Sequence, residues 1–235
     1  MDTEPLLKTY AVPYKYGKAI IEGSGVEGAF DSVCVGMPFM FRHNGKNFML
    51  YTGFDGIGYQ SALAVSDDLL HWQHYGMVLE RTGIKGKWDS IQTCGTWILR
   101  DEELYGTYKP KKFQGKYWMI YHSYPEAGVE EGPGVMGMAW TEDENLLDWH
   151  RLDEPIFSWR DGADWEKGGL YKASLVQKDD TFYAFYNAKN QTTGSWIEQT
   201  GVVTSKDLVH WERYKENPVI RVKPDSWRSK FVSDP

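Results

Sequence analysis

An internal repeat occurs three times in the sequence and constrains the fold more than any other feature of the chain. Each repeat contains a short run of aromatic and apolar residues that starts from turn residues, as β-strands do. These runs are GKNFMLYTG from Gly45, GKYWMIYHS from Gly115 and DTFYAFYNA from Asp180. A second run follows each of them: SALAVS to Ser66, VMGMAWT to Thr141 and TGVVTS to Ser205. The repeat therefore predicts two consecutive strands in each unit.

Each second run leads into an acidic turn that ends in a tryptophan. The turns read SDDLLHW, TEDENLLDW and SKDLVHW, and their tryptophans are Trp72, Trp149 and Trp211. Sixteen residues beyond each turn tryptophan lies another one, at Trp88, Trp165 and Trp227. We interpret the turn tryptophans as packing anchors of the repeat rather than as platforms for sugars.

A unit of four antiparallel strands followed by a connector is typical of a β-propeller blade. The first strand of each blade is predicted in MPFMF, GTWIL and KASLV, around Pro38, Thr96 and Ala173. A fourth unit begins at Trp227, and the stretch through Tyr14 and Ile20-Ile21 is predicted to be the last strand of an earlier blade. Three units and two fragments do not close a ring. We therefore expect an all-β propeller of four-stranded blades, truncated after its third blade, with residues 1–235 forming one domain.

Composition excludes several classes of function. The 235 residues carry a net charge of -7, which argues against binding to a phosphate backbone and so against nucleic acid as a partner. No run of 18 apolar residues occurs, so no membrane partner is expected, and the start MDTEPLLKTY is unlike a signal peptide, which predicts a cytoplasmic protein. Cys34 and Cys94 show no zinc spacing. Neither a metal site nor a cofactor is expected.

Three acidic residues occupy one position of the repeat. They lie seven residues before the inner-strand positions Pro38, Thr96 and Ala173, and they are Asp31, Asp89 and Glu166. Inner strands meet at the axis of a propeller, so we predict that these carboxylates converge there. Neighbouring carboxylates hold one proton between them, as acid/base cleavage of a glycosidic bond requires. The alternative is that each acid caps a turn at the entry to its blade.

Other polar residues follow predicted strands and suit a hydroxyl-rich ligand. The candidates for substrate binding are Asp55, His122, Glu131, Lys172, Lys189 and Glu198. Asp234, which precedes Pro235 near the start of the fourth unit, is a further catalytic candidate. Simpler interpretations are available for several of them: a turn for Asp55 and Asp234, a solvated loop for Glu131, a structural role for His122, and a pairing between neighbouring strands for Lys189 and Glu198.

The repeats resemble the five-bladed β-propeller glycoside hydrolases, a superfamily that includes family 43 and the invertase-like enzymes. The resemblance is carried by the three acidic turns, the GKNFMLY and GKYWMIY strands, and the FDS, WDS, WEKGGLYK and SDP segments. It implies an oligosaccharide or glycoside substrate, with Asp31 as base, Asp89 as the residue that tunes a pKa and Glu166 as acid. The sequence departs from family 43 at Gly36-Met37-Pro38, where no acid precedes the proline, while Asp234-Pro235 keeps the Asp-Pro pair.

Three functions are compatible with this sequence. The leading hypothesis is a glycoside hydrolase that uses Glu166 as general acid, with Asp31 or Asp234 activating water. The second is a glycoside phosphorylase in which Lys172, Lys189 and Arg228 hold phosphate. The third is a non-catalytic propeller that binds glycans, which the missing acid at Met37 would explain.

Overall fold

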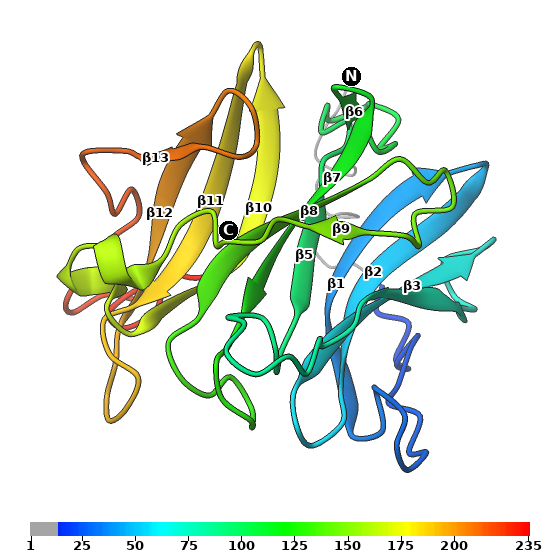
Figure 1. Cartoon of the computed structure of the whole chain (residues 1–235), viewed down its shortest axis with the longest axis horizontal. Helices are drawn as coiled ribbons and strands as arrows, with labels where there is room; N and C mark the ends of the chain where they lie inside the picture. The colour runs from blue at the N-terminus through cyan, green and yellow to red at the C-terminus, as the bar shows by residue number, and fades with distance from the viewer. Residues whose placement is uncertain (1–13) are drawn as a thin grey trace.

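The computed structural model describes residues 14–235 and contains three antiparallel sheets. Figure 1 shows these sheets fanned out in chain order, as the blades of a propeller are. The predicted all-β fold built from four-stranded blades is therefore confirmed. Besides strands, the described part of the chain has two short 3₁₀-helices, Trp159–Asp161 and Asp164–Glu166, which lie in the connector between the second and third blades.

Strands run from the inside of each blade outward in chain order. The first blade consists of β1 (Cys34–His43), β2 (Lys46–Phe54), β3 (Tyr59–Ser66) and β4 (Gln73–Leu79). The second consists of β5 (Cys94–Ile98), β7 (Lys116–Ser123), β8 (Val135–Thr141) and β9 (His150–Arg151), with β6 (Lys112–Phe113) paired to β7. The third consists of β10 (Gly169–Lys178), β11 (Thr181–Lys189), β12 (Glu198–Ser205) and β13 (Trp211–Arg213). The strands predicted in the three complete units occur where the repeat placed them.

The hydrophobic core lies between neighbouring blades. One cluster joins the first and second blades and includes Phe39, Leu50, Leu63, Met119 and Tyr121. Another joins the second and third blades and includes Leu99, Ile120, Met138, Leu175 and Phe182. Because the central strands are covered on both faces, they read as continuous apolar runs rather than as an alternating pattern. Burying each large side chain contributes about 1.5–3 kcal/mol, so packing between blades stabilises the fold.

The acidic turns are built alike in all three blades. Each turn tryptophan donates its indole N–H to the carbonyl oxygen three residues earlier, and these bonds are Trp72 to Leu69 (3.0 Å), Trp149 to Leu146 (2.7 Å) and Trp211 to Leu208 (3.1 Å). The three leucines have left-handed backbones, with φ of 68°, 59° and 66°. Asp68, Asp143 and Asp207 accept backbone N–H groups that the turn leaves free. This geometry agrees with the interpretation of the tryptophans as packing anchors.

The two ends of the repeat differ from each other. Residues 14–33 contain no strand, so the strand predicted through Tyr14 and Ile20-Ile21 is wrong; the two isoleucines instead pack on a cluster that includes Met49 and Tyr51. At the other end, the Glu198 N–H donates to the Lys230 carbonyl (3.0 Å), and the Val232 N–H donates to the Glu198 carbonyl (3.1 Å).

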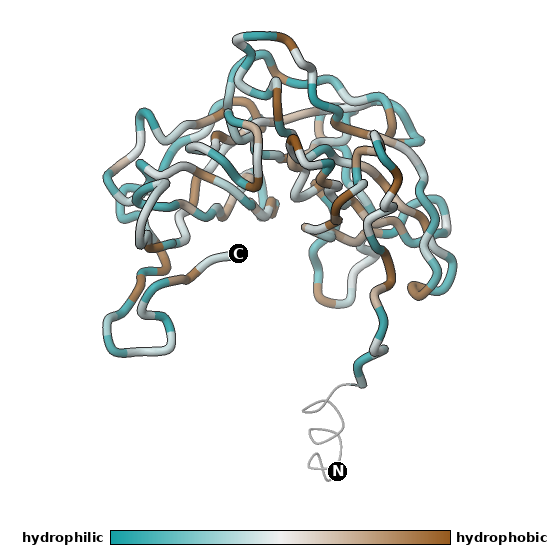
Figure 2. The backbone as a smooth tube through the Cα atoms, turned by 90° about the horizontal axis from the view of Figure 1, so that it is seen from below, coloured by the Kyte–Doolittle hydropathy of each residue, from teal (hydrophilic) through white to brown (hydrophobic). Residues whose placement is uncertain are grey.

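Backbone hydrogen bonds of the same kind join neighbouring complete blades. The Thr93 N–H donates to the Tyr59 carbonyl (2.8 Å), and the Leu170 N–H donates to the Gly134 carbonyl (2.9 Å). The segment 230–232 therefore lies where an inner strand would begin. Figure 2 shows this C-terminal segment turning back beneath the arch of the sheets. Among the residues described, none lies in a helix long and apolar enough to cross a membrane.

Candidate active site at the propeller axis

A pocket of about 300 Å³ lies where the three inner strands meet the C-terminal segment. Its lining comes in neighbouring pairs, one pair from each of these elements: Met37 and Pro38, Thr96 and Trp97, Lys172 and Ala173, Asp234 and Pro235. Met37, Lys172 and Asp234 occupy the same position of the repeat and all have left-handed backbones, with φ of 52°, 40° and 63°. In β1 and β10 the strand pairing is interrupted by a bulge at this position. The repeat thus brings one such residue to the axis from each of the first blade, the third blade and the C-terminal segment.

Polar contacts surround the Asp234 carboxylate beside this pocket. The Lys172 ammonium lies 3.0 Å from Asp234 Oδ1, and the Asn187 amide donates to the same oxygen (3.3 Å). The Lys172 backbone N–H donates to Nδ1 of the buried His122 (3.3 Å). Burial, together with the charges of Lys172 and Lys189, lowers the pKa of His122 to about 3. His122 is therefore neutral at physiological pH and carries its proton on Nε2.

Two glutamates lie near Lys189, close to the ends of β11 and β12. The Lys189 ammonium is 3.4 Å from Glu130 Oε2, and the Trp196 indole donates to Glu198 Oε1 (2.9 Å). Burial, followed by the nearby carboxylate of Glu198, raises the pKa of Tyr171, so this phenol keeps its proton. We call Glu130, Glu198, Asp234, Lys172 and Lys189 the axial cluster.

Buried polar atoms without partners gather around the axial cluster. Among residues 14–235, His122 Nε2, Tyr124 Oη and Asn187 Oδ1 are buried and accept or donate no hydrogen bond. Leaving such groups unpaired costs about 1–3 kcal/mol each. His122 offers a donor, Asn187 an acceptor and Tyr124 a group that can do either. These three groups match the chemistry of a hydroxyl-rich ligand, but they are closed to solvent and none of their residues lines the axial pocket.

The structure brings together most of the predicted binding residues. His122, Lys172, Lys189 and Glu198 lie at the axis with Asp234. Glu131 is exposed, and its neighbour Glu130, with a left-handed φ of 55°, meets Lys189 instead. Asp55 accepts the backbone N–H groups of residues 57 and 58 (3.0 and 3.1 Å) and pairs with Arg81, which is the turn that the sequence left open as an alternative. The sequence did not identify Tyr171 as a site residue, because it resembles the other aromatic residues of the predicted strands.

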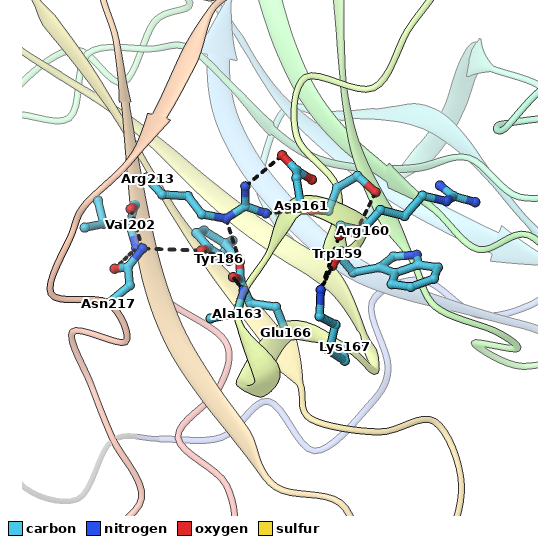
Figure 3. A network of polar contacts seen from close by, with 11 residues as sticks. Trp159, Arg160, Asp161, Ala163, Glu166, Lys167, Tyr186, Val202, Arg213 and Asn217 are labelled. Carbon is cyan, nitrogen blue, oxygen red and sulfur yellow. Dashed lines mark hydrogen bonds and ion pairs between the residues drawn. The ribbon is translucent and has the colours of Figure 1, made fainter.

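Glu166 lies away from the axis, in a network on the outer side of the third blade (Figure 3). Its carboxylate is 1% exposed and accepts hydrogen bonds from the Tyr186 hydroxyl (2.8 Å), the Arg213 guanidinium (2.9 Å) and the Ala163 N–H (2.8 Å). Arg213 belongs to β13, the outermost strand of the sheet. Every short contact of Glu166 is thus within its own blade or the connector leading into it.

Asp89 sits in the equivalent network of the second blade. It accepts hydrogen bonds from the Tyr121 hydroxyl (3.2 Å) and from Arg151 (3.1 Å), which belongs to the outermost strand β9. The tryptophan before each acid stacks on the same tyrosine that the acid contacts: Trp88 on Tyr121 and Trp165 on Tyr186.

The first blade repeats this arrangement with smaller groups. Phe30 packs on Tyr51, whose hydroxyl contacts His74 (3.1 Å), and His74 has the same place in the register as Arg151 and Arg213. Burial and the charge of Asp31 raise the pKa of Tyr51 to about 12.

The prediction that Asp31, Asp89 and Glu166 converge at the axis is therefore wrong. Asp89 and Glu166 each bond the tyrosine and the arginine of their own blade, and Asp31 lies close enough to Tyr51 for its charge to act on that phenol. Of the three acids, only Glu166 accepts a backbone N–H among the described residues, from Ala163 (2.8 Å), as the turn-capping alternative requires. Within residues 14–235, no group of three or more acidic, histidine or cysteine side chains could hold a metal ion.

The buried neutral His122 makes stability depend on pH. Its pKa of about 3 in the folded protein lies below the ordinary value of about 6.5, so the unfolded chain takes up a proton as the pH falls while the native state does not. Lowering the pH from 7 to 5 is expected to cost about 2 kcal/mol through this residue. Urea unfolding of His122→Gln at the two pH values should show this loss removed. The exposed His150→Gln serves as control, and an unchanged pH dependence in His122→Gln would contradict the assignment.

Residues 106–235 match the family described as the glycosyl hydrolases family 32 N-terminal domain. The chain belongs to this family. Two solved structures resemble it closely, one described as a BT0996 RGII complex and one as a glycoside hydrolase, at 34% and 33% identity. Each has a TM-score of 0.72, and each alignment covers 81% of this chain and 59% of the other.

A curated relative of this family 32 chain is the 1,2-beta-oligomannan phosphorylase of Thermoanaerobacter sp. (strain X514). The two are 23% identical over 198 residues, which cover 67% of this chain and 65% of the relative. The chain thus spans about three fifths to two thirds of the length of the proteins it matches. The comparisons confirm a propeller domain of glycoside hydrolase type.

Proposed function

We propose that this domain cleaves glycosidic bonds of an oligosaccharide by hydrolysis at the axial cluster. The observation that carries the proposal is the grouping of three carboxylates, Glu130, Glu198 and Asp234, around the phenol of Tyr171, with Asp234 also lining the axial pocket. Cleavage of a glycosidic bond needs one protonated carboxylic acid at the leaving oxygen and one ionised carboxylate as base or nucleophile. The axial cluster supplies enough carboxyl groups for both roles.

The contacts of each glutamate support a division of roles. Glu130 lies beside the Lys189 ammonium, at 3.4 Å, and we assign it the role of base. Glu198 has no cationic side-chain partner in the described part of the chain, whereas Glu130 and Asp234 each have one, so we assign Glu198 the role of acid. Family 43 enzymes use a base, an acid and a carboxylate that tunes a pKa. By likeness to them, we propose Asp234 as the third carboxylate.

Phosphorolysis is the second candidate, and the curated phosphorylase relative favours it. Phosphate needs cations that are free to bind it, whereas Lys172 and Lys189 are each paired with a carboxylate. Each ammonium group is offset by its own carboxylate, so the axial cluster carries no excess positive charge. Arg228, the third residue predicted to hold phosphate, bonds residues 223 and 226 through its backbone, and it is not among the described residues that line the axial pocket. Charge therefore favours water over phosphate as the attacking group.

Substrate and location are part of the same proposal. One of the two similar structures is named as a glycoside hydrolase, which supports an oligosaccharide or glycoside as the substrate of this domain. We expect neither nucleic acid nor a membrane as partner, and the cytoplasmic location inferred from the N-terminal sequence stays a prediction.

Turnover of aryl glycosides and oligosaccharides, with and without inorganic phosphate, tests the reaction type. We expect sugar release that is unaffected by about 10 mM phosphate, because the axial lysines are already paired. Release that requires phosphate and yields a sugar phosphate would show a phosphorylase. Glycan binding by calorimetry without turnover on any substrate would support the non-catalytic alternative.

A further inference from the structure

Lys189 is an unusual lysine, because its ammonium is buried within a cage of aromatic rings. The residue is 9% exposed and ends β11. Its Nζ lies 5.0 Å from the ring centroid of Tyr171, 5.3 Å from that of Trp196 and 5.8 Å from that of Tyr124. Cation–π attraction of this kind holds an ammonium in place, and the rings leave little room for other rotamers.

The single charged partner of this caged ammonium in the described residues is Glu130, at 3.4 Å. Glu130 belongs to the loop between β7 and β8, which has no regular secondary structure, and it adopts a left-handed backbone. The base of this loop is fixed by Gln92, whose amide donates to the carbonyls of residues 126 and 128 (2.7 and 3.0 Å). Within residues 14–235, the side chain of Glu130 itself is held only by Lys189, which comes from the next blade.

We propose that Lys189 is the positioning residue for Glu130. The aromatic cage fixes the ammonium, and the ammonium in turn fixes the carboxylate and the tip of the loop that carries it. The catalytic part of this inference rests on the role proposed above for Glu130. A carboxylate displaced by about 1 Å loses about 10²-fold in rate, so the effect of releasing it is measurable.

The test compares Lys189→Met and Lys189→Arg with the parent protein. Methionine fills the aromatic cage without the charge, and arginine keeps the charge. Lys206→Met is the matched control, because Lys206 lies in the same blade and makes an exposed ion pair with Asp180. Two readouts are needed: kcat and KM on the best substrate, and hydrogen–deuterium exchange of peptides spanning residues 124–134.

For Lys189→Met we expect a fall of about 10²-fold in kcat, a smaller change in KM and faster exchange in the loop, with β11 and β12 unchanged. Lys189→Arg should recover part of kcat, and Lys206→Met should match the parent. Unchanged loop exchange in Lys189→Met would overturn the proposal, and so would an unchanged kcat in an active parent. If the parent shows no turnover, the function proposed above fails, while the exchange measurement still decides the role of Lys189.

Discussion

Replacing Glu198 by glutamine is expected to lower kcat by about 10²–10⁴-fold while leaving the fold intact. Glutamine has the size of glutamate, and its amide oxygen can still accept the Trp196 indole N–H that Glu198 accepts at 2.9 Å. It cannot deliver a proton to a leaving oxygen. Glu198 is half-buried and has no salt bridge among residues 14–235, so the free energy of unfolding should change by less than about 1 kcal/mol.

Steady-state kinetics and urea unfolding of the same preparations check this expectation. Glu212→Gln is the matched control, because Glu212 is exposed on β13 in the same blade. Glu130→Gln should also lose activity, by a similar factor, if it is the base. An active Glu198→Gln enzyme would remove this residue from the mechanism. Loss of activity that accompanies unfolding would assign it a structural role.

Replacing Glu166 by glutamine is expected to have the opposite pattern, with lost stability and preserved chemistry. Glu166 is buried against Arg213, and removing one partner of a buried ion pair leaves the other charge uncompensated, at a cost of about 3 kcal/mol. For a domain of this size such a loss lowers Tm by about 6–12 °C. At temperatures well below the transition, kcat should stay within about threefold of the parent.

The control for Glu166 is Asp161, an exposed residue that pairs with the same arginine, Arg213. Asp161 lies 3.1 Å from Arg213 with its side chain 64% exposed, so Asp161→Asn should cost less than about 1 kcal/mol. Calorimetric melting and kcat at room temperature separate the two interpretations. A large loss of kcat in a Glu166→Gln protein that melts like the parent would restore the role of general acid that the sequence resemblance implies.

The fold was predictable because every level of the sequence agrees on it. Strand runs, acidic turns and the tryptophan spacing each recur three times, and a strand covered on both faces by neighbouring blades needs an apolar run such as FMLY or FYAFY. The exception is Ile20-Ile21, which is apolar and yet not a strand. Two adjacent apolar residues that pack on Met49 and Tyr51 need no strand pairing, and the sequence does not distinguish the two cases.

The site was predictable only in part, because the repeat gives the position along a strand but not the side of the blade. Asp31, Asp89 and Glu166 recur as catalytic residues would, yet Asp89 and Glu166 each bond a tyrosine of their own blade and an arginine of its outermost strand. Polar residues at strand ends were a better guide, since His122, Lys172, Lys189 and Glu198 do meet. The choice between Glu130 and Glu131 depended on one left-handed backbone, which no local pattern in EEGP specifies.

The most direct test of the account is a crystal structure of the Glu198→Gln variant with an oligosaccharide substrate bound. We expect the oxygen of the scissile bond to lie within hydrogen-bond reach of the glutamine side chain at position 198, and a water molecule bonded to Glu130 to lie beside that bond. Sugar hydroxyls should bond His122 Nε2 and Asn187 Oδ1. A substrate bound instead beside Asp31, Asp89 or Glu166 would contradict the assignment of the axial cluster as the active site.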